Sequence, residues 1–257
     1  MKEFGKVSII TPSYNCADFI EETIESVIAQ TYMDWEMLIT DDCSTDNSVE
    51  VISQYVKKDP RIKLYRLSKN GGPGVARNNS IEKAKGRFIA FCDSDDRWLP
   101  EKLEKQLELM HEKNAGCCFG SYYECTEDGK PISIVEAKPI LTFTDEKHAN
   151  QIGCLTGIYD TDVVGKQFMP LIRKRQDWAL WLNIMKITKC AYAILEPCAY
   201  YRIRANSISR NKLDLIKYNA AIYEEIFHYP HWKALLYTLF INIPTYFLKR
   251  RQVKSIN

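Results

Sequence analysis

The chain has 257 residues, enough for one large domain or two small ones with a sizeable core. Hydrophobic residues make up 46% and charged residues 26%, and the formal net charge of +2 excludes a nucleic-acid binder that relies on bulk positive charge. The nine cysteines are scattered without a Cys-x-x-Cys pair, and no run reaches the ~18 apolar residues of a membrane span. We therefore expect a reduced, cytoplasmic protein with no nucleic-acid partner.

Strands and helices are expected to alternate through about the first hundred residues. Apolar and β-branched runs predict strands at 7–11, 36–40, 62–66 and 88–92, and helical spacing of apolar residues predicts helices at 18–30, around 49–56, at 75–85 and at 99–112. This alternation is typical of a mostly parallel sheet with right-handed crossovers. The loops that follow the strands must then lie at one edge of the sheet. The turn cluster at Pro12 is expected to end the first strand.

The fourth strand leads directly into three carboxylates, Asp93, Asp95 and Asp96. Ligands of open α/β sheets bind at the carboxyl ends of the strands. Carboxylates this close repel one another unless a cation shares them, and their hard oxygen atoms suit Mg²⁺ or Mn²⁺, which in turn hold diphosphates. The alternative is a solvated acidic turn that caps the next helix, which Pro100 would open. The position directly after a buried strand favours the metal site.

The second half of the chain is less regular. A strand is expected at about 116–123 and a hairpin turn at Asp128–Gly129, and no other element is assigned within 124–150. A helix is expected over 173–187, a strand over 191–195 and a further helix over 213–227.

The segment 234–248 is rich in aromatic and aliphatic residues and is followed by a basic cluster, Lys249, Arg250 and Arg251. It is too short to span a bilayer. Its composition suits a helix that lies on an anionic membrane surface, but a helix packed on the domain core explains it equally well. Both alternatives remain open at this point.

Four motifs in the first hundred residues resemble those of family 2 glycosyltransferases, which have the GT-A fold. They are Val7-Ser-Ile-Ile-Thr-Pro-Ser-Tyr-Asn15, Asp41-Asp-Cys-Ser-Thr-Asp46, Gly72-Pro-Gly-Val-Ala-Arg-Asn78 and Asp93-Ser-Asp-Asp96. Gln176-Asp-Trp178 is similar to the family's acceptor-side acid motif. The resemblance covers about residues 6–210 and implies a Rossmann-like, mostly parallel sheet flanked by helices.

The same resemblance implies how the chain is divided. We expect a GT-A glycosyltransferase domain at 1–210, with a nucleotide-sugar donor half at 1–112 and an acceptor half at 113–210. A C-terminal helical extension follows at 211–257.

The resemblance also implies a donor site for a UDP-sugar. It assigns donor binding to Pro12, Tyr14, Asp42, Gly72, Arg77 and Asp93. Tyr14 would stack on the uracil base, and Asp42, rather than Asp41, would accept the hydrogen bond from its ring N–H. Arg77 would neutralise the diphosphate or orient the sugar. The structural alternatives are a loop cap for Asp41, a plain turn for the glycines and a surface ion pair for Arg77.

Two acids of the cluster correspond to residues that hold the cofactor, Mn²⁺ or Mg²⁺, in the family. Asp95 matches the main metal ligand, and Asp93 matches the acid that meets the ribose or the metal. Asp96 is expected to brace the loop through Arg97 or a backbone N–H.

The family's catalytic base is a carboxylate in the second half of the chain, and the matching residue is Asp177. The residue before it is usually Glu but is Gln176 here, which leaves the role of that position open. A base opposite the leaving group implies single displacement with inversion. Alternatively, Asp177 only offsets the positive charge of Arg173, Lys174 and Arg175 at the start of a helix.

Two further stretches, 175–182 and 201–209, are similar to those of bacterial enzymes that build O-antigen or capsule repeat units. They imply transfer of one hexose, galactose or glucose, from a UDP-sugar to a polyprenyl-diphosphate-linked sugar such as GlcNAc at the cytoplasmic face of the inner membrane. Arg202, Arg204 and Arg210 would meet the diphosphate of the acceptor, and the C-terminal tail would make a peripheral membrane contact. The Gln-x-x-Arg-Trp signature of processive synthases is absent, which favours one sugar per encounter.

Two functions from other classes remain as alternatives. One is a nucleotide-sugar-binding protein without transferase activity, and the other is a nucleotidyltransferase.

Overall fold

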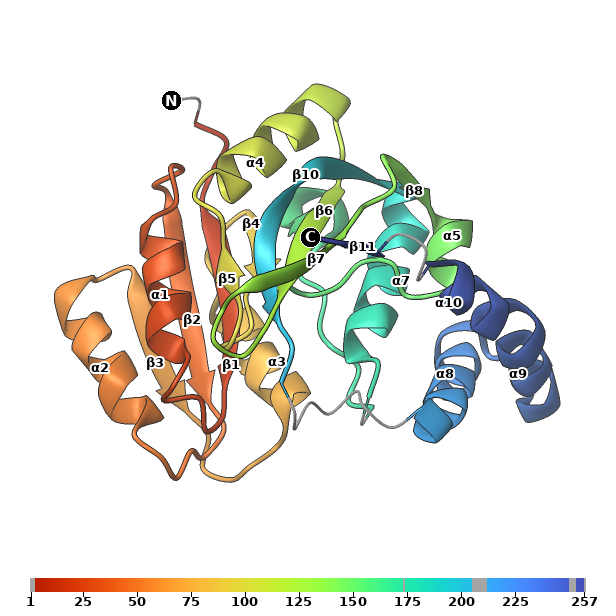
Figure 1. The fold of residues 1–257 in the computed structure, drawn as a ribbon, viewed down its shortest axis with the longest axis horizontal. Coiled ribbons are helices and arrows are strands. Elements are labelled where there is room, and N and C mark those ends of the chain that lie inside the picture. Colours follow the sequence, from red (N-terminus) through yellow and green to blue (C-terminus); the bar gives the residue numbers. More distant parts are fainter. Residues whose placement is uncertain (1–2, 173, 205–211, 250–252, 257) are drawn as a thin grey trace.

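The computed structural model describes residues 3–172, 174–204, 212–249 and 253–256. The first part of the chain alternates strands and helices, as expected (Figure 1). The strands are β1 (Val7–Ser13), β2 (Trp35–Asp41), β3 (Ile62–Arg66) and β4 (Phe88–Phe91), and the helices are α1 (Ile20–Ile28), α2 (Ser48–Lys58), α3 (Pro73–Lys83) and α4 (Lys102–Lys113). β1 pairs in parallel with both β2 and β4, and β2 pairs in parallel with β3.

Both faces of this parallel region are covered, and every residue of β1, β2 and β4 is buried. Side chains alternate between the faces along each strand, so neighbouring residues of β1 enter different cores. Ile9 packs in the core cluster that contains buried residues of α1, α2 and α4. Ile10 packs in a second cluster, with Ile81 of α3 and Trp181 from the second half of the chain.

The first strand continues past Pro12, contrary to the expectation that this residue ends it. β1 runs to Ser13, and Pro12 is opposite Thr40 of β2. The pairing of β1 with β4 already ends at Ile10 and Phe91. Beyond that point β1 has a neighbour on one side only, so the missing N–H of Pro12 leaves no ladder bond unmade.

The rest of the chain adds further helices and strands that pair mostly antiparallel, except that β10 pairs with β6 in parallel. The strands are β5 (Arg97–Trp98), β6 (Cys117–Cys125), β7 (Pro131–Val135), β8 (Ile140–Thr142), β9 (Ile158–Asp160), β10 (Cys190–Arg202) and β11 (Val253–Ser255). The helices before the tail are α5 (Phe143–His148), α6 (Thr161–Val164) and α7 (Gln176–Thr188). The main path through the sheet is β11-β7-β6-β9-β4-β1-β2-β3, and β10 pairs with β5, β6 and β8.

Several of these elements differ from the sequence-based expectation. The hairpin turn at Asp128–Gly129 is confirmed between β6 and β7. The strand expected at 191–195 is part of the much longer β10, whose register with β6 shifts on both sides of Pro197. Helix α4 begins at Lys102 and not at Leu99, because Leu99 still donates its N–H to the carbonyl of Cys198 at 2.9 Å.

The C-terminal segment forms α8 (Lys212–Phe227), α9 (His231–Tyr237), a π-helical turn η1 (Thr238–Asn242) and α10 (Ile243–Lys249). These helices lie at the end of the molecule opposite α2 (Figure 1). One side packs on the domain, where Tyr223 of α8 meets Trp178 of α7 edge to face at 5.6 Å between ring centroids. Ala234 and Thr238 are fully buried. Among the described residues, no helix combines the length and apolarity needed to cross a bilayer.

Candidate active site

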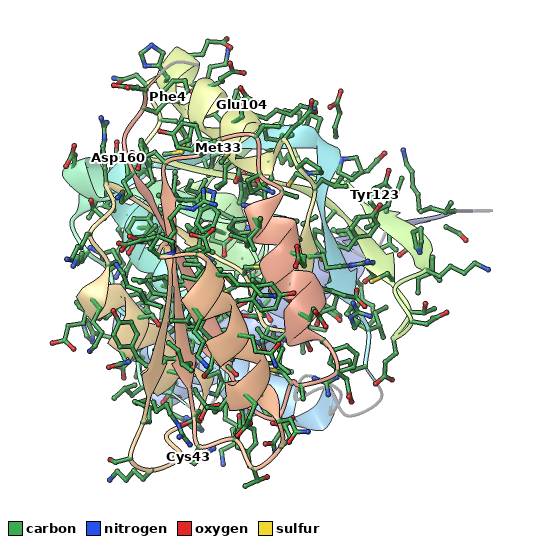
Figure 2. All side chains as sticks on the ribbon, turned by 90° about the vertical axis from the view of Figure 1, so that its left-hand side faces the viewer. Phe4, Met33, Cys43, Glu104, Tyr123 and Asp160 are labelled. Carbon is green, nitrogen blue, oxygen red and sulfur yellow. The ribbon has the colours of Figure 1, made fainter. Side chains whose placement is uncertain are left out.

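The carboxyl ends of the parallel strands meet at one edge of the sheet, as the sequence predicts. Cys43, which follows β2, lies at this edge, and Met33, which precedes β2, lies at the opposite end of the strands (Figure 2). The loops after β1 and β2 are tied together, since Ser44 Oγ accepts the N–H of Asn15 at 3.0 Å and Asn15 Oδ1 accepts the N–H of Thr45 at 2.8 Å. Tyr14 is half exposed in this region and has a free ring surface for a ligand.

Asp42 holds the glycine-rich turn that leads into α3. Its Oδ1 and Oδ2 accept the backbone N–H groups of Gly71 and Gly72, each at 2.7 Å. Gly72 has a φ of +83°, which favours glycine. Each carboxylate oxygen keeps a second lone pair, so Asp42 can still accept a further N–H from a ligand. Asp41 is fully buried, with Oδ2 accepting the N–H of Ser44 at 3.1 Å.

Arg77 lies on the first turns of α3 and reaches the acid cluster. Its Nη2 donates to Asp93 Oδ1 at 2.6 Å. Burial opposes the charge on Arg77, but nearby groups, with Asp93 foremost among them, together outweigh this effect and raise the pKa of the guanidinium. The Nε of Arg77 is buried without a hydrogen-bond partner in the described residues. A surface ion pair is therefore excluded, and the unpartnered N–H suits an anionic or hydroxylated ligand.

The other two acids of the cluster have different surroundings. Asp95 pairs with Arg204 at the end of β10, with Nη1 and Oδ2 3.2 Å apart. Asp96 is buried, and its Oδ1 accepts the backbone N–H of Arg202 at 2.9 Å. Of the two expected ways of bracing the loop, through Arg97 or through a backbone N–H, the structure shows the second. Burial raises the pKa of Asp95, and Asp93 raises it further. Burial raises the pKa of Asp96 in the same way, followed by the charges of Asp95 and Asp93.

Arg202 does not have the role that the sequence suggests. It was expected to bind the diphosphate of the acceptor, but it is buried and binds other groups of the protein. Its Nε donates to the backbone oxygen of Asp95 at 2.8 Å, and its Nη2 lies 2.8 Å from Oε2 of Glu22. Arg210, the third arginine of that expectation, lies outside the described residues.

Asp177 lies in the first turn of α7. Its Oδ2 accepts a hydrogen bond from Nδ2 of Asn150 at 2.8 Å. Arg175 does not use Asp177 as its partner, because its Nε donates to Oδ1 of Asn219 at 3.0 Å. The alternative that Asp177 only offsets the preceding basic residues therefore finds no support from Arg175. Arg173 lies outside the described residues.

The amino ends of α3 and α7 come into direct contact. A Cβ on Gly74 would lie 2.4 Å from Nε2 of Gln176, so the amide end of Gln176 lies directly against the backbone at the start of α3. Several charged groups of the site also affect the pKa of the buried Cys154 thiol. Burial raises the pKa of that thiol, and Arg77, Asp93 and Asp177 are among the charges that act on it. Of the donor-side and acceptor-side residues predicted from sequence, Arg77, Asp93 and Asp177 therefore lie near one another.

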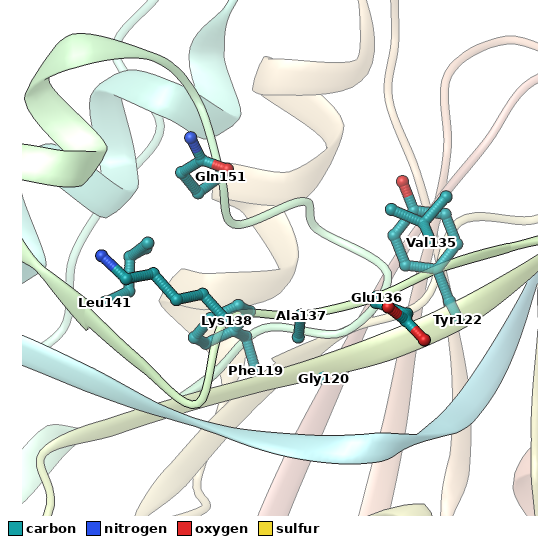
Figure 3. A pocket seen from close by; sticks show the side chains of 9 residues that line it. All are labelled: Phe119, Gly120, Tyr122, Val135, Glu136, Ala137, Lys138, Leu141 and Gln151. Carbon is teal, nitrogen blue, oxygen red and sulfur yellow. The ribbon is translucent and has the colours of Figure 1, made fainter. Parts of the chain in front are cut away.

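Asn150 is the site residue that sequence analysis missed. It lies in the irregular segment after α5, where no motif or periodicity distinguishes it. Next to it, Gln151 lines a hollow in the acceptor half of the chain (Figure 3). The other lining residues come from β6 and from 135–141, and are Phe119, Gly120, Tyr122, Val135, Glu136, Ala137, Lys138 and Leu141.

The residues present fit a divalent cation of the Mg²⁺ or Mn²⁺ type. Such ions are commonly held by one or two carboxylates together with phosphate oxygens of the substrate, and they do not need a protein cage. Asp95 and Asp93 supply such carboxylates. Within the described part of the chain, no cluster of three or more histidine, cysteine or acidic side chains is arranged to hold a metal by itself.

Comparison with known protein families gives a clear result for residues 8–164. They match the model of the family "Glycosyl transferase family 2". The chain belongs to this family. Membership sets aside both alternatives from the sequence, a binding protein and a nucleotidyltransferase.

Two bacterial relatives illustrate the relationship. TuaG of Bacillus subtilis (strain 168), a glycosyltransferase assigned to teichuronic acid biosynthesis, is 46% identical over 221 residues, covering 86% of this chain and 88% of TuaG. WfgD of Escherichia coli is named as a UDP-Glc:alpha-D-GlcNAc-diphosphoundecaprenol beta-1,3-glucosyltransferase. It is 37% identical over 216 residues, covering 82% of each chain.

Two solved structures show the same fold. S. aureus TarS, residues 1–349 with UDP-GlcNAc, superposes with a TM-score of 0.71 at 22% identity, covering 95% of this chain and 76% of that chain. The mannosyltransferase PcManGT from Pyrobaculum calidifontis, with GDP-Man and Mn²⁺, has a TM-score of 0.67 at 16% identity, covering 96% and 74%. The expected GT-A fold is confirmed.

Proposed function

We propose that this glycosyltransferase moves one hexose, glucose or galactose, from a UDP-sugar to a GlcNAc linked through diphosphate to a polyprenyl lipid, as a step in building a bacterial O-antigen or related polysaccharide. The observation that carries the proposal is the pair of Arg77 and Asp93, with Asp177 near enough for its charge to act on Arg77 as well. The activity for which WfgD is named supports the choice of donor and acceptor.

The donor half of the site, built from residues 1–112, suits a nucleoside diphosphate sugar. The half-exposed ring of Tyr14 offers a surface on which uracil can stack. Tyr14 directly follows β1, near whose end Pro12 fixes the backbone. Asp42 keeps lone pairs for the ring N–H, and the turn at Gly72 brings backbone close to the ligand. The unpartnered Nε of Arg77 would donate to the diphosphate or the sugar.

The proposed cofactor is Mn²⁺ or Mg²⁺, held by Asp95 and Asp93. When bound, the cation would act as a Lewis acid that stabilises the leaving diphosphate. The protein itself adds positive charge at the same place through Arg77, whose guanidinium is already fixed by Asp93.

The acceptor half, residues 113–210, supplies the base. Asp177 would take the proton from the acceptor hydroxyl as that oxygen attacks the anomeric carbon and the bond to UDP breaks. Asn150 holds Oδ2 of the carboxylate, which leaves Oδ1 to face the acceptor. Attack from the side opposite UDP inverts the anomeric carbon, so an α-linked donor gives a β-linked product.

The acceptor that we propose is anchored in a membrane, and we place the enzyme at the cytoplasmic face of the inner membrane with the tail 211–257 in contact with lipid. Trp232, Phe240 and Phe247 are 64%, 71% and 60% exposed although they are large and apolar. They alternate with the buried residues that pack the tail on the domain. Residues 228–257 contain five lysines and arginines and no acidic residue, which suits an anionic leaflet.

Release of UDP tests the proposal. The full chain is incubated with UDP-glucose, UDP-galactose and UDP-GlcNAc in the presence of Mn²⁺, with and without a synthetic GlcNAc-diphosphate-lipid. We expect UDP release that depends on the acceptor, with glucose or galactose as the donor, and a β-linked product by NMR. Measurable UDP binding without acceptor-dependent release from either hexose donor would contradict it.

A further inference from the structure

Arg204 occupies part of the surroundings of Asp95 in which a cation would bind. Its Nη1 is 3.2 Å from Oδ2 of Asp95, the carboxylate to which we assign the metal. The side chains of Arg204 and Asp95 are 31% and 26% exposed, so the pair is open to solvent on one side. The guanidinium also lies 4.6 Å from the ring centroid of Phe19.

The backbone that carries Arg204 is fixed without this ion pair. Arg202, two residues earlier, binds the backbone oxygen of Asp95 through Nε at 2.8 Å, and its own N–H binds Asp96 Oδ1 at 2.9 Å. It also pairs with Glu22 at 2.8 Å. The end of β10 is therefore expected to stay in place when the ion pair between Arg204 and Asp95 breaks.

The arginines that pair with the side chains of Asp93 and Asp95 differ in burial. The side chain of Arg77, paired with Asp93 at 2.6 Å, is 11% exposed, against 31% for Arg204. Arg204 is the more exposed of the two, and its contact with Asp95 at 3.2 Å is longer and weaker than that of Arg77 with Asp93. A divalent cation that approaches Asp95 meets the positive charge of Arg204 and must displace it, because like charges this close repel.

We propose that Arg204 is a built-in counter-ion of Asp95 that competes with the divalent cation. This inference rests on the metal site of the proposed function. Without nucleotide, Arg204 keeps Asp95 neutralised and weakens cation binding. A bound diphosphate brings negative charge that can receive Arg204, so that cation and UDP bind cooperatively.

Direct measurement of Mn²⁺ binding tests this proposal without any sugar transfer. The dissociation constant of Mn²⁺ is measured by EPR of the free ion on the full chain, with and without UDP. Arg204→Gln removes the charge and keeps much of the side chain, and Arg204→Lys keeps the charge. The matched control is Arg66→Gln, because Arg66 is an exposed arginine 3.9 Å from another site carboxylate, Asp41.

Without UDP, we expect Arg204→Gln to bind Mn²⁺ about tenfold more tightly than the wild type, whereas Arg204→Lys and Arg66→Gln stay within about twofold. With saturating UDP the gap between Arg204→Gln and the wild type should shrink. Equal or weaker Mn²⁺ binding by Arg204→Gln, or equal tightening by Arg66→Gln, would overturn the counter-ion role.

Asp95→Asn separates failure of this inference from failure of the proposed function. If the wild type binds Mn²⁺ and Asp95→Asn does not, the metal site is supported even when Arg204→Gln has no effect on Mn²⁺ binding. If none of the proteins binds Mn²⁺ with or without UDP, both the metal dependence and the competition are refuted.

Discussion

Asn150 donates a hydrogen bond from Nδ2 to Oδ2 of Asp177 at a distance of 2.8 Å. Both residues are anchored through Glu146, a fully buried residue of α5. Its Oε2 accepts the N–H of Gln151, the residue after Asn150, at 2.9 Å. Its backbone oxygen accepts the indole N–H of Trp178, the residue after Asp177, at 2.7 Å. The carboxylate assigned as the base is thus held in one orientation.

This contact predicts a selective loss of turnover. Asn150→Ala leaves Asp177 free to rotate, so we expect kcat to fall about tenfold or more while KM for the UDP-sugar stays within about twofold. Asn150→Asp has nearly the same shape but cannot donate, and it brings a second carboxylate against Asp177, so the loss should be larger. Steady-state kinetics with the synthetic acceptor measure both parameters. Unchanged kcat in Asn150→Asp would rule out a positioning role.

Asp42 is predicted to support UDP binding through the turn that it holds. Asp42→Asn replaces one accepting oxygen by an N–H₂ group, which cannot accept from both Gly71 and Gly72. We expect the dissociation constant of UDP, measured by calorimetry with Mn²⁺ present, to rise about tenfold. Asp59→Asn is the control, because Asp59 also accepts a backbone N–H, that of Arg61 at 2.9 Å, but lies before β3 and not at its carboxyl end. Equal effects in the two variants would contradict this role.

The exposed apolar face of the tail is predicted to bind anionic lipid. Phe240→Ser combined with Phe247→Ser removes two of its largest exposed side chains. We expect this double variant to lose most of its flotation with phosphatidylglycerol-containing vesicles, since each side chain contributes about 1.5–3 kcal/mol when it is buried.

A matched control for the tail uses exposed apolar residues elsewhere on the molecule. Ile187 and Leu195 are 50% and 54% exposed and lie outside the tail. The double variant Ile187→Ser and Leu195→Ser should float like the wild type. If the tail variant floats as well as this control, lipid contact through the tail is refuted.

The buried Lys102 predicts how stability depends on pH. Burial lowers its pKa from 10.5 to about 8, although its Nζ donates to Oε1 of Gln106 at 2.7 Å and lies 3.8 Å from the ring centroid of Trp98. Between about pH 8 and 10.5 the unfolded chain holds a proton on this group that the folded chain has lost, so stability rises with pH in that window. Below pH 8 both states carry the proton, and the cost of burying the charge is fully present.

Comparison with Lys102→Met isolates this contribution from that of other groups. Between pH 7 and pH 9 the free energy of unfolding of the wild type should rise by about 1 kcal/mol relative to the variant. Urea unfolding at the two pH values measures the difference. Parallel behaviour of the two proteins would show that Lys102 does not change its protonation on unfolding in this range.

The donor half of the fold could be predicted from sequence because its information is local. β1 to β4 are short apolar runs, and the helices between them show their spacing within a single window. The acids that follow β2 and β4 are then placed at one edge by topology alone. The end of β1 was wrong, because the effect of Pro12 depends on which neighbour lies beside the strand. The start of α4 was also wrong, because Leu99 is bound to Cys198, which is distant along the chain.

The acceptor half could not be predicted in the same way, since its pairings are distant along the chain. β9 has three residues and is inserted between β4 and β6, a position that no local pattern indicates. Pro197 interrupts the apolar pattern of β10, and the irregular register around it is visible only in the structure. The burial of Arg202 and the contact of Asn150 with Asp177 likewise depend on segments that meet only after folding.

The most direct test of the central claim compares the wild type with Asp177→Asn. UDP release with the cognate donor and the synthetic acceptor is measured together with UDP affinity. The account predicts that Asp177→Asn binds UDP as the wild type does but loses about 100-fold or more of its acceptor-dependent rate, because the carboxylate that accepts the proton is gone. A variant that keeps the wild-type rate would contradict the assignment of Asp177 as the base.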